Sequence, residues 1–142
     1  MADESGERDL TGRRVDRAVY VARNARGAEV RIGGADAEGA FTPGELLQIA
    51  AAACASLTAD HILSSRLGET FDASFTVEGD GVKGENRYEK ITTKVVVDMS
   101  TLDAERQEKL IERAEKAIER LCSVGRTVEQ GAATQVDVVA DS

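Results

Sequence analysis

TPGELLQIAAAACASLTADHILSSRL, residues 42–67, has the length and composition of one long helix, around which the other predicted elements are arranged. Thr42 suits the N-cap, and Pro43 suits the first helical position, where its missing N–H costs nothing. Gly68 follows the last residue and can end the helix. The first half is apolar on most faces, and alanines at residues 50–53 allow neighbouring backbones to approach closely. We therefore expect a buried central helix that is packed on several sides.

Segments on both sides of this helix predict β-hairpins. Before it, residues 15–32 alternate apolar and polar side chains around a turn at residues 23–27. After it, residues 71–77 and 91–99 alternate in the same way, and the glycine-containing residues 78–87 join them as a loop. Alternation with a period of two is typical of strands with one buried face, so we expect four strands here.

A second helix is predicted downstream, where Ser100 and Asp103 resemble a capping box. Apolar residues then recur along one face at helical spacing. The opposite face carries acidic and basic residues paired at i, i+4, each pair being worth about 0.2–0.5 kcal/mol. The apolar stripe consists of Leu110, Ile111, Ala114, Ala117, Ile118 and Leu121, and the pairs are Glu105 with Lys109 and Glu112 with Lys116.

The remaining segments complete a predicted β-β-α-β-β-α-β order. We expect residues 123–132 to form a turn region and residues 134–139 to form a final strand. Residues 1–14 are polar and charged, and we expect a short disordered tail there. Because the sequence has no internal repeat and no second domain, residues 15–142 are predicted to form a single α+β domain.

Charge and composition argue against several classes of function. The 142 residues carry 18 basic and 26 acidic side chains, a net charge of −8, so nucleic acid and anionic membranes are poor partners. No stretch is expected to supply the roughly 20 apolar residues of a membrane span. The charged first residues lack an apolar leader region, so we expect a cytoplasmic protein. Two cysteines and one histidine are too few for a four-ligand Cys/His zinc site, and we expect neither metal nor cofactor.

The residue pattern does not decide whether the two cysteines, Cys54 and Cys122, serve packing, a structural disulfide or redox chemistry. Their separation of 68 residues is neither a redox CxxC motif nor a metal-binding knuckle. A permanent disulfide is disfavoured in a reducing cytoplasm. On the residue pattern alone, inert packing is the more common use, because free cysteine behaves as a small hydrophobic side chain. Redox chemistry is the alternative. His61, in the later part of the first helix, is expected to be a packed or surface residue.

The sequence context of each cysteine suggests a family. Residues 42–47, TPGELL, lead on to Ala53 and Cys54, and residues 122–126 read CSVGR. These contexts resemble the Thr-Asn-Pro-Glu opening with its later Ala-Cys, and the Cys-Pro-Val-Ser block, of the OsmC/Ohr family, the osmotically inducible and organic hydroperoxide resistance proteins. The resemblance extends over residues 15–139 and respects the order of the elements. It implies a divergent OsmC-like member that forms an intertwined homodimer, with the long helices packed centrally between sheets.

The resemblance also implies a thiol peroxidase that acts without a cofactor. Cys54 would attack the O–O bond of an organic hydroperoxide as a thiolate. The resulting sulfenic acid would condense with Cys122 to a disulfide, which an external dithiol would reduce. In the family, an arginine of the N-terminal hairpin, held by a glutamate next to the helix proline, activates the thiol. Arg26 and Glu45 are the counterparts implied here.

Several positions depart from the family pattern. Gly44 follows the helix proline where the family has glutamate, and Glu45 lies one residue later, about 100° further around the helix. Arg23 and Arg31 are alternatives for the activating arginine. Ser123 occupies the position of the family's second proline.

Two functional hypotheses follow from these residues. The first is a peroxidase in oxidative stress defence. The second is a non-enzymatic protein of the same fold that binds a small apolar ligand at the dimer interface and keeps its cysteines in the core. A redox sensor would use the same cysteine chemistry as the first. Sulfur atoms close together, with an arginine near the thiol, favour the peroxidase; sulfur atoms far apart in apolar surroundings favour the binding protein.

Overall fold

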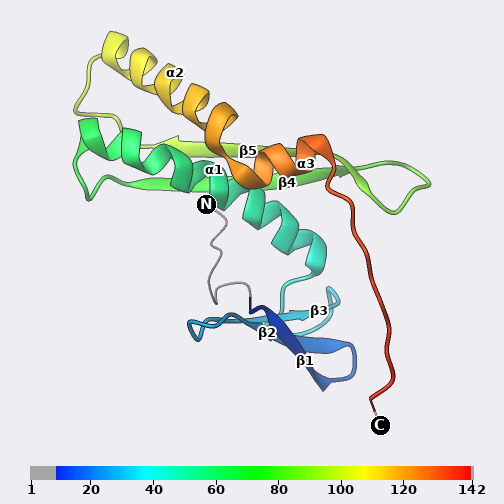
Figure 1. Ribbon diagram of the computed structural model, residues 1–142. Coiled ribbons are helices and arrows are strands. Elements are labelled where there is room, and N and C mark those ends of the chain that lie inside the picture. The colour runs from blue at the N-terminus through cyan, green and yellow to red at the C-terminus, as the bar shows by residue number, and fades with distance from the viewer. Residues whose placement is uncertain (1–8, 142) are drawn as a thin grey trace. The chain divides into compact units, whose positions relative to one another are not determined.

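The computed structural model describes residues 9–141 and has an α+β fold (Figure 1). Three antiparallel strands, β1, β2 and β3, form one sheet, and β4 and β5 form a second. By its contacts the chain divides into two compact units. The first contains the described residues up to Ala52 and Thr76–Lys94; the second contains Ala53–Phe75 and the described residues from Val95 onward. The elements are β1 (Thr11–Asp16), β2 (Val19–Arg23), β3 (Glu29–Gly33), α1 (Pro43–Leu67), β4 (Ala73–Gly81), β5 (Tyr88–Val97), α2 (Ala104–Leu121) and α3 (Ser123–Gln130).

The predicted hairpin of the first unit is confirmed by β2 and β3. At its turn end the register places Arg23 opposite Glu29, and the two side chains form an ion pair at 2.5 Å. Asn24 shapes the turn, because its Oδ1 atom accepts the backbone N–H groups of Arg26 at 3.0 Å and Ala28 at 2.9 Å. Arg26 therefore lies in an exposed turn.

The first strand corrects a prediction. The disordered tail expected over residues 1–14 is wrong from residue 11 onward, because Thr11–Asp16 is β1 and pairs with β2. All six residues of β1 are exposed, so the strand lacks the alternation that marks a strand with one buried face. Residues 1–8 lie outside the described residues.

The long helix α1 begins and ends where the sequence predicts. Thr42 Oγ1 accepts the Glu45 N–H at 3.1 Å, and Glu45 Oε1 accepts the Thr42 N–H at 2.8 Å, which makes a reciprocal capping box. At the other end, Gly68 adopts a φ of +90° and donates its N–H to the Ser64 carbonyl. The helix therefore has both of its predicted caps.

Burial of α1 on several sides is not achieved by residues 9–141 alone. Of its residues, all of which are described, Ala52, Ala59 and Leu63 are buried, whereas Leu57 is 72% exposed. The sequence was expected to contain no segment long enough for a membrane span, yet α1 meets that requirement by length and composition. The core helix of a soluble protein passes the same test. The helix thus presents apolar surface, such as Leu57, that the described part of the chain leaves exposed.

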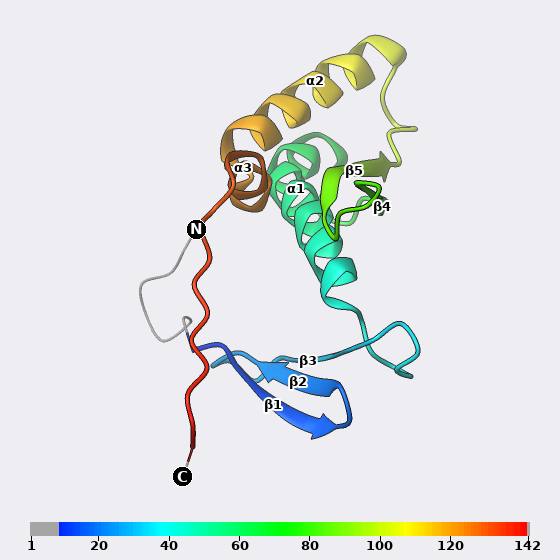
Figure 2. The same cartoon turned by 90° about the vertical axis from the view of Figure 1, so that its right-hand side faces the viewer.

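The core of the second unit lies between α1 and α2, which pack side by side (Figure 2). Ala59 and Leu63 of α1 meet Leu110 and Ala114 of α2, and all four are 7% exposed or less. The small alanine side chains let the two helices approach closely. Partly buried apolar residues surround this centre: Ile62, Leu67, Phe71, Val97, Met99, Leu102 and Ile118.

The cap of α2 is Asp103 alone, so the capping box expected of Ser100 and Asp103 is not formed. Asp103 Oδ1 accepts the Arg106 N–H at 2.9 Å. Ser100 instead donates its N–H to Asp98 Oδ1 at 2.9 Å. The predicted ion pairs are present, Lys109 with Glu105 at 3.3 Å and Lys116 with Glu112 at 3.0 Å.

The second predicted hairpin is confirmed by β4 and β5, which extend further into the loop than expected. β4 continues to Gly81 and β5 begins at Tyr88. The Val82 N–H donates to the Arg87 carbonyl at 3.0 Å, which closes the remaining turn. Gly79 and Gly81 therefore belong to β4, and Gly84 is the one glycine of residues 78–87 that lies in the turn.

The end of the chain differs from the prediction. The turn region expected over residues 123–132 contains α3, which ends at Gly131 with a φ of +69°. The strand expected over residues 134–139 is not formed, and within residues 9–141 this segment is paired with no strand. Val136, Val138 and Val139 are 83–95% exposed. A strand needs a neighbour for its backbone hydrogen bonds, which local sequence does not supply.

Candidate thiol site

The two cysteines come from different elements of the second unit. Cys54 lies on α1 and is half-buried. Cys122 lies between α2 and α3 and caps both helices: its N–H donates to the Ile118 carbonyl at 3.0 Å, and its Sγ accepts the Gly125 N–H at 3.4 Å. Cys122 is 3% exposed. One thiol is therefore accessible and the other is enclosed.

The structure brings these two thiols together. Neither forms a disulfide, and their sulfur atoms are in hydrogen-bonding contact. Ser123 Oγ lies 3.8 Å from Cys54 Sγ. The backbone N–H groups of Ser123 and Val124 also hydrogen bond to that sulfur. The first turn of α3 thus supplies Cys54 with donors, beside the thiol of Cys122.

These contacts lower the pKa of the Cys54 thiol. Burial opposes ionisation and is the largest single influence, but several hydrogen bonds together outweigh it. They come from the Val124 N–H, the Cys122 thiol, and the Ser123 hydroxyl and N–H. The N-terminus of a helix also carries a partial positive charge that favours a thiolate. Cys54 is therefore the thiol of the pair that ionises first.

The pKa of the Cys122 thiol is raised instead. Its burial is the main cause, and the hydrogen bond from the Gly125 N–H only partly offsets it. Cys122 also donates to Cys54 and feels the negative charge on that sulfur, so its own ionisation is disfavoured further. The pair therefore divides into an ionisable thiol and a neutral one.

Alkylation by iodoacetamide over a range of pH is expected to separate the two cysteines. Because the pKa of Cys54 is lowered, its alkylation rate should rise at lower pH than that of an ordinary cysteine. Cys122 has a raised pKa and little exposure, so near neutral pH its alkylation rate should be lower than that of Cys54 by a factor of roughly ten or more. Mass spectrometry of the two tryptic peptides measures both rates. Equal rates with the same pH midpoint would contradict this assignment.

Arg26 and Glu45, the other candidate residues, lie in the first unit. Arg26 is exposed in the β2–β3 turn, where its backbone N–H is bonded to Asn24. The carboxylate of Glu45 is engaged in capping α1. Arg23 is paired with Glu29, and Arg31 lies on β3. The activating roles that the resemblance implies for these residues stay predictions.

Gly44, where the family has glutamate, has a specific neighbour within the first unit. A Cβ atom at Gly44 would overlap the hydroxyl of Tyr88 and lie 3.2 Å from its Cζ. Gln48 Nε2 holds that hydroxyl at 3.1 Å and also donates to the Gly44 carbonyl at 3.1 Å. Gly79 leaves room for the other side of the same ring, since its Cβ would lie 2.8 Å from Tyr88 Cδ1. The tyrosine hydroxyl therefore occupies the space that a side chain at position 44 would need.

Gly44→Ala is expected to destabilise the protein by about 1–3 kcal/mol, the usual cost of forcing an atom into occupied space. Alanine normally stabilises a helix relative to glycine, so a loss here would have to come from the Tyr88 contact. Tyr88→Phe removes the overlapping hydroxyl and should recover most of the loss in the double variant. Urea unfolding of the four proteins measures the coupling. The contact would be disproved by an alanine variant as stable as the parent in both backgrounds.

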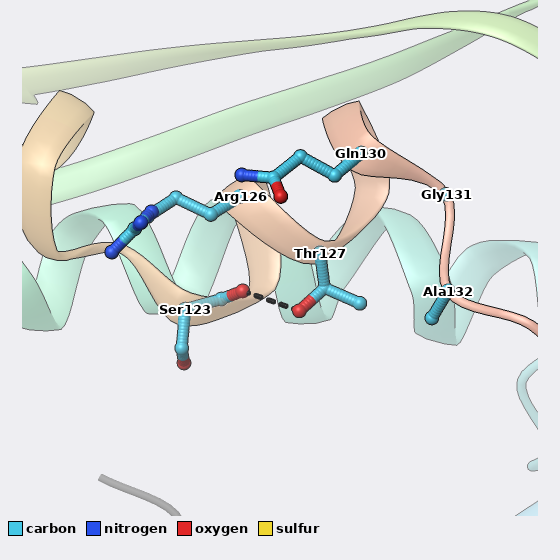
Figure 3. Close-up of a pocket in the computed structure, with 6 residues that line it drawn as sticks. All are labelled: Ser123, Arg126, Thr127, Gln130, Gly131 and Ala132. Atoms are coloured by element: carbon cyan, nitrogen blue, oxygen red, sulfur yellow. Dashed lines mark hydrogen bonds between the residues drawn. The ribbon is translucent and has the colours of Figure 1, made fainter.

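An open pocket runs along α3 on the side that begins at Ser123 (Figure 3). Thr127 Oγ1 donates to the Ser123 carbonyl at 2.7 Å, and Arg126 Nη1 donates to the Arg120 carbonyl at 3.1 Å. Ser123, whose hydroxyl contacts Cys54, is the first of the residues that line it. Its lining residues are Ser123, Arg126, Thr127, Gln130, Gly131 and Ala132.

The described residues thus combine an α+β fold, which has one long helix and two small sheets, with a pair of contacting thiols. The family described as OsmC-like protein matches residues 33–137 of the sequence. The chain belongs to the OsmC-like family, as its two cysteine contexts indicated.

Relatives extend this assignment at the level of sequence and of fold. Uncharacterised proteins of Mycobacterium tuberculosis and Mycobacterium bovis are each 39% identical over 120 residues, which cover 84% of this chain and 88% of theirs. A solved hypothetical protein from Aquifex aeolicus is similar with a TM-score of 0.67, at 21% identity over 87% of each chain. The OsmC-like protein from Mycoplasma pneumoniae is similar with a TM-score of 0.62, at 17% identity, and the match covers 87% of this chain and 86% of that one. The organic hydroperoxide resistance protein OhrB of Bacillus subtilis is similar with a TM-score of 0.53, at 20% identity, and the match covers 84% of this chain and 88% of that one.

Proposed function

We propose that the protein is a thiol peroxidase that reduces organic hydroperoxides, with Cys54 as the attacking thiolate and Cys122 as the resolving thiol. The observation that supports the proposal most strongly is a pair of contacting thiols that differ in pKa and in burial. Cys54 is half-buried with a lowered pKa, and it contacts a buried Cys122 whose pKa is raised. A peroxidatic cysteine needs a thiolate that the substrate can reach, and a resolving cysteine needs proximity to it.

The reaction has three steps in this proposal. The Cys54 thiolate attacks the hydroxyl oxygen of the hydroperoxide, the O–O bond breaks, and an alcohol leaves after its oxygen gains a proton. The sulfur is now a sulfenic acid. The Cys122 sulfur attacks the Cys54 sulfur, a disulfide forms, and water leaves with the thiol proton. An external dithiol then reduces the disulfide by exchange and is itself oxidised to a disulfide, which restores both thiols.

Membership of the family supports a hydroperoxide as the substrate. One protein with the same fold is named an organic hydroperoxide resistance protein. We extend that chemistry to this chain as a role in oxidative stress defence. A dithiol reductant and a cytoplasmic location fit the proposal, because the cycle requires thiols that are returned to the reduced state.

The alternative, a binding protein with structural cysteines, requires the sulfur atoms to lie apart in apolar surroundings. Cys54 instead contacts a thiol, a hydroxyl and two backbone N–H groups. An inert core cysteine has no need of four donors. These contacts favour the peroxidase.

Steady-state reduction of cumene hydroperoxide with excess dithiothreitol tests the proposed function. The reduced protein should consume peroxide faster than dithiothreitol alone, in proportion to protein concentration. A rate equal to that of dithiothreitol alone would refute the proposed function.

We also propose that the protein works as an intertwined homodimer. Leu57 on α1 and Leu121 on α2 are 72% and 62% exposed, and Val138 near the chain's end is 95% exposed. Large exposed apolar surface is typical of an interface. Residues 134–139, which pair with no strand among residues 9–141, would then form the expected final strand against a second copy.

Sedimentation equilibrium at micromolar concentration is expected to give about 30 kDa, twice the 15.1 kDa of one chain. Removal of residues 133–142 should weaken the dimer, since it deletes the strand offered to the partner. A full-length protein that sediments at the mass of one chain would contradict the dimer.

A further inference from the structure

Ser123 contacts the reacting sulfur although the family pattern has a proline at its position. Its Oγ lies 3.8 Å from Cys54 Sγ, and its backbone N–H bonds to the same sulfur. A proline has neither a hydroxyl nor an N–H, so it could supply neither donor. The departure from the family pattern therefore adds two hydrogen-bond donors at the thiol.

The position of Ser123 is fixed by the bonds that build α3. Its carbonyl accepts the Thr127 hydroxyl at 2.7 Å, as the dashed line in Figure 3 shows, so the Ser123 hydroxyl takes no part in that bond. The Cys122 carbonyl accepts the Arg126 N–H at 3.0 Å, and Cys122 Sγ accepts the Gly125 N–H. Ser123 is thus held as the first residue of α3, directly after the buried thiol.

We propose that Ser123 is a catalytic residue of the peroxide reaction, whose hydroxyl donates a hydrogen bond to the Cys54 sulfur and keeps that sulfur facing Cys122 through thiolate and sulfenic acid. The inference rests on the proposed peroxidase function. A thiolate only accepts hydrogen bonds, so in the reactive state the hydroxyl is the donor of this contact. The hydroxyl keeps its proton throughout, and the steps of the cycle remain balanced as written above.

The test compares Ser123→Ala, Ser123→Thr and Ser123→Pro with a matched control, Ser65→Ala. Ser65 lies on the exposed side of α1, and its hydroxyl donates to the Ile62 carbonyl at 2.6 Å. Each variant is measured in two ways: the pH profile of Cys54 alkylation by iodoacetamide, and the rate of its first reaction with cumene hydroperoxide. The alkylation rate depends on the fraction of Cys54 that is ionised, and it can be measured without peroxidase turnover.

Ser123→Ala should move the alkylation midpoint of Cys54 to higher pH and slow the peroxide reaction about three- to tenfold near neutral pH, because one bond to a charged group is lost. Ser123→Thr retains the hydroxyl, so its alkylation midpoint should return toward that of the parent and its peroxide reaction rate should lie within about twofold of the parent rate. Ser123→Pro removes both donors and should shift the midpoint further than alanine does. Ser65→Ala should match the parent.

The outcomes separate the two proposals. A parent protein that fails to consume peroxide refutes the proposed function. A parent that consumes peroxide, with a Ser123→Ala variant unchanged in both midpoint and rate, overturns the role of Ser123 alone. Loss in the alanine variant without rescue by threonine would also overturn it, because a purely structural defect does not depend on the hydroxyl.

Discussion

Cys54→Ser is expected to reduce the catalysed consumption of cumene hydroperoxide to the background of the dithiol, a loss of roughly a thousandfold or more. A serine hydroxyl stays protonated among the same donors, so it cannot act as the nucleophile that attacks the O–O bond. The contacts around position 54 should survive, because the Val124 and Ser123 N–H groups can bond to oxygen as they do to sulfur. Initial rates at several protein concentrations measure the loss.

Two observations control this experiment. Far-UV circular dichroism and urea unfolding should show a folded protein, since serine replaces a half-buried side chain of similar size. Ser65→Ala on the same helix should retain the parent rate. A Cys54→Ser variant that consumed peroxide at the parent rate would remove Cys54 from the mechanism.

Cys122→Ser is expected to separate the two halves of the cycle. Cys54 keeps its backbone donors, so its first reaction with peroxide should stay within about threefold of the parent rate. No thiol then remains to resolve the sulfenic acid, which should accumulate and react further with excess peroxide to sulfinic acid. Turnover with limiting dithiol should fall roughly tenfold or more.

A sulfenic acid trap such as dimedone identifies this intermediate by mass. The trap should label Cys54 in the Cys122→Ser variant and leave the parent largely unlabelled. A variant with the parent's turnover and no trapped adduct would show that Cys122 does not resolve the intermediate.

Local signals in the sequence were sufficient for much of the fold. The limits of α1 followed from Thr42, Pro43 and Gly68, and the β2–β3 hairpin followed from alternation around a turn. Each of these features depends on residues that are close together in the chain. For these two elements the structure confirmed the signal.

The elements that were missed lacked a local signal. β1 is exposed along its whole length, so no apolar alternation marks it. α3 has only eight residues, and its N-cap is a cysteine rather than one of the preferred capping residues. Residues 134–139 do carry strand-like alternation, but a strand forms only where another strand accepts its hydrogen bonds. The length of the tail and the final strand were mispredicted for these reasons.

The candidate site was predictable only in part. Cys54 and Cys122 were singled out by their contexts, whereas their contact depends on how α1 meets the junction of α2 and α3. The donors on α3 could not be inferred without that helix. Tyr88 filling the space above Gly44 is a contact across 44 residues of sequence, and no short-range pattern indicates it.

The roles of Cys54 and Cys122 are tested together by the fate of the two thiols after one equivalent of cumene hydroperoxide is added with no reductant present. One peroxide accepts two electrons, so we expect the loss of both thiols per chain and a Cys54–Cys122 disulfide within one chain, identified by peptide mapping. Addition of dithiothreitol should then restore both thiols. Two thiols that remain titratable after the peroxide is added, or a disulfide that links different chains, would show that Cys54 and Cys122 of one chain are not the peroxidatic and resolving pair.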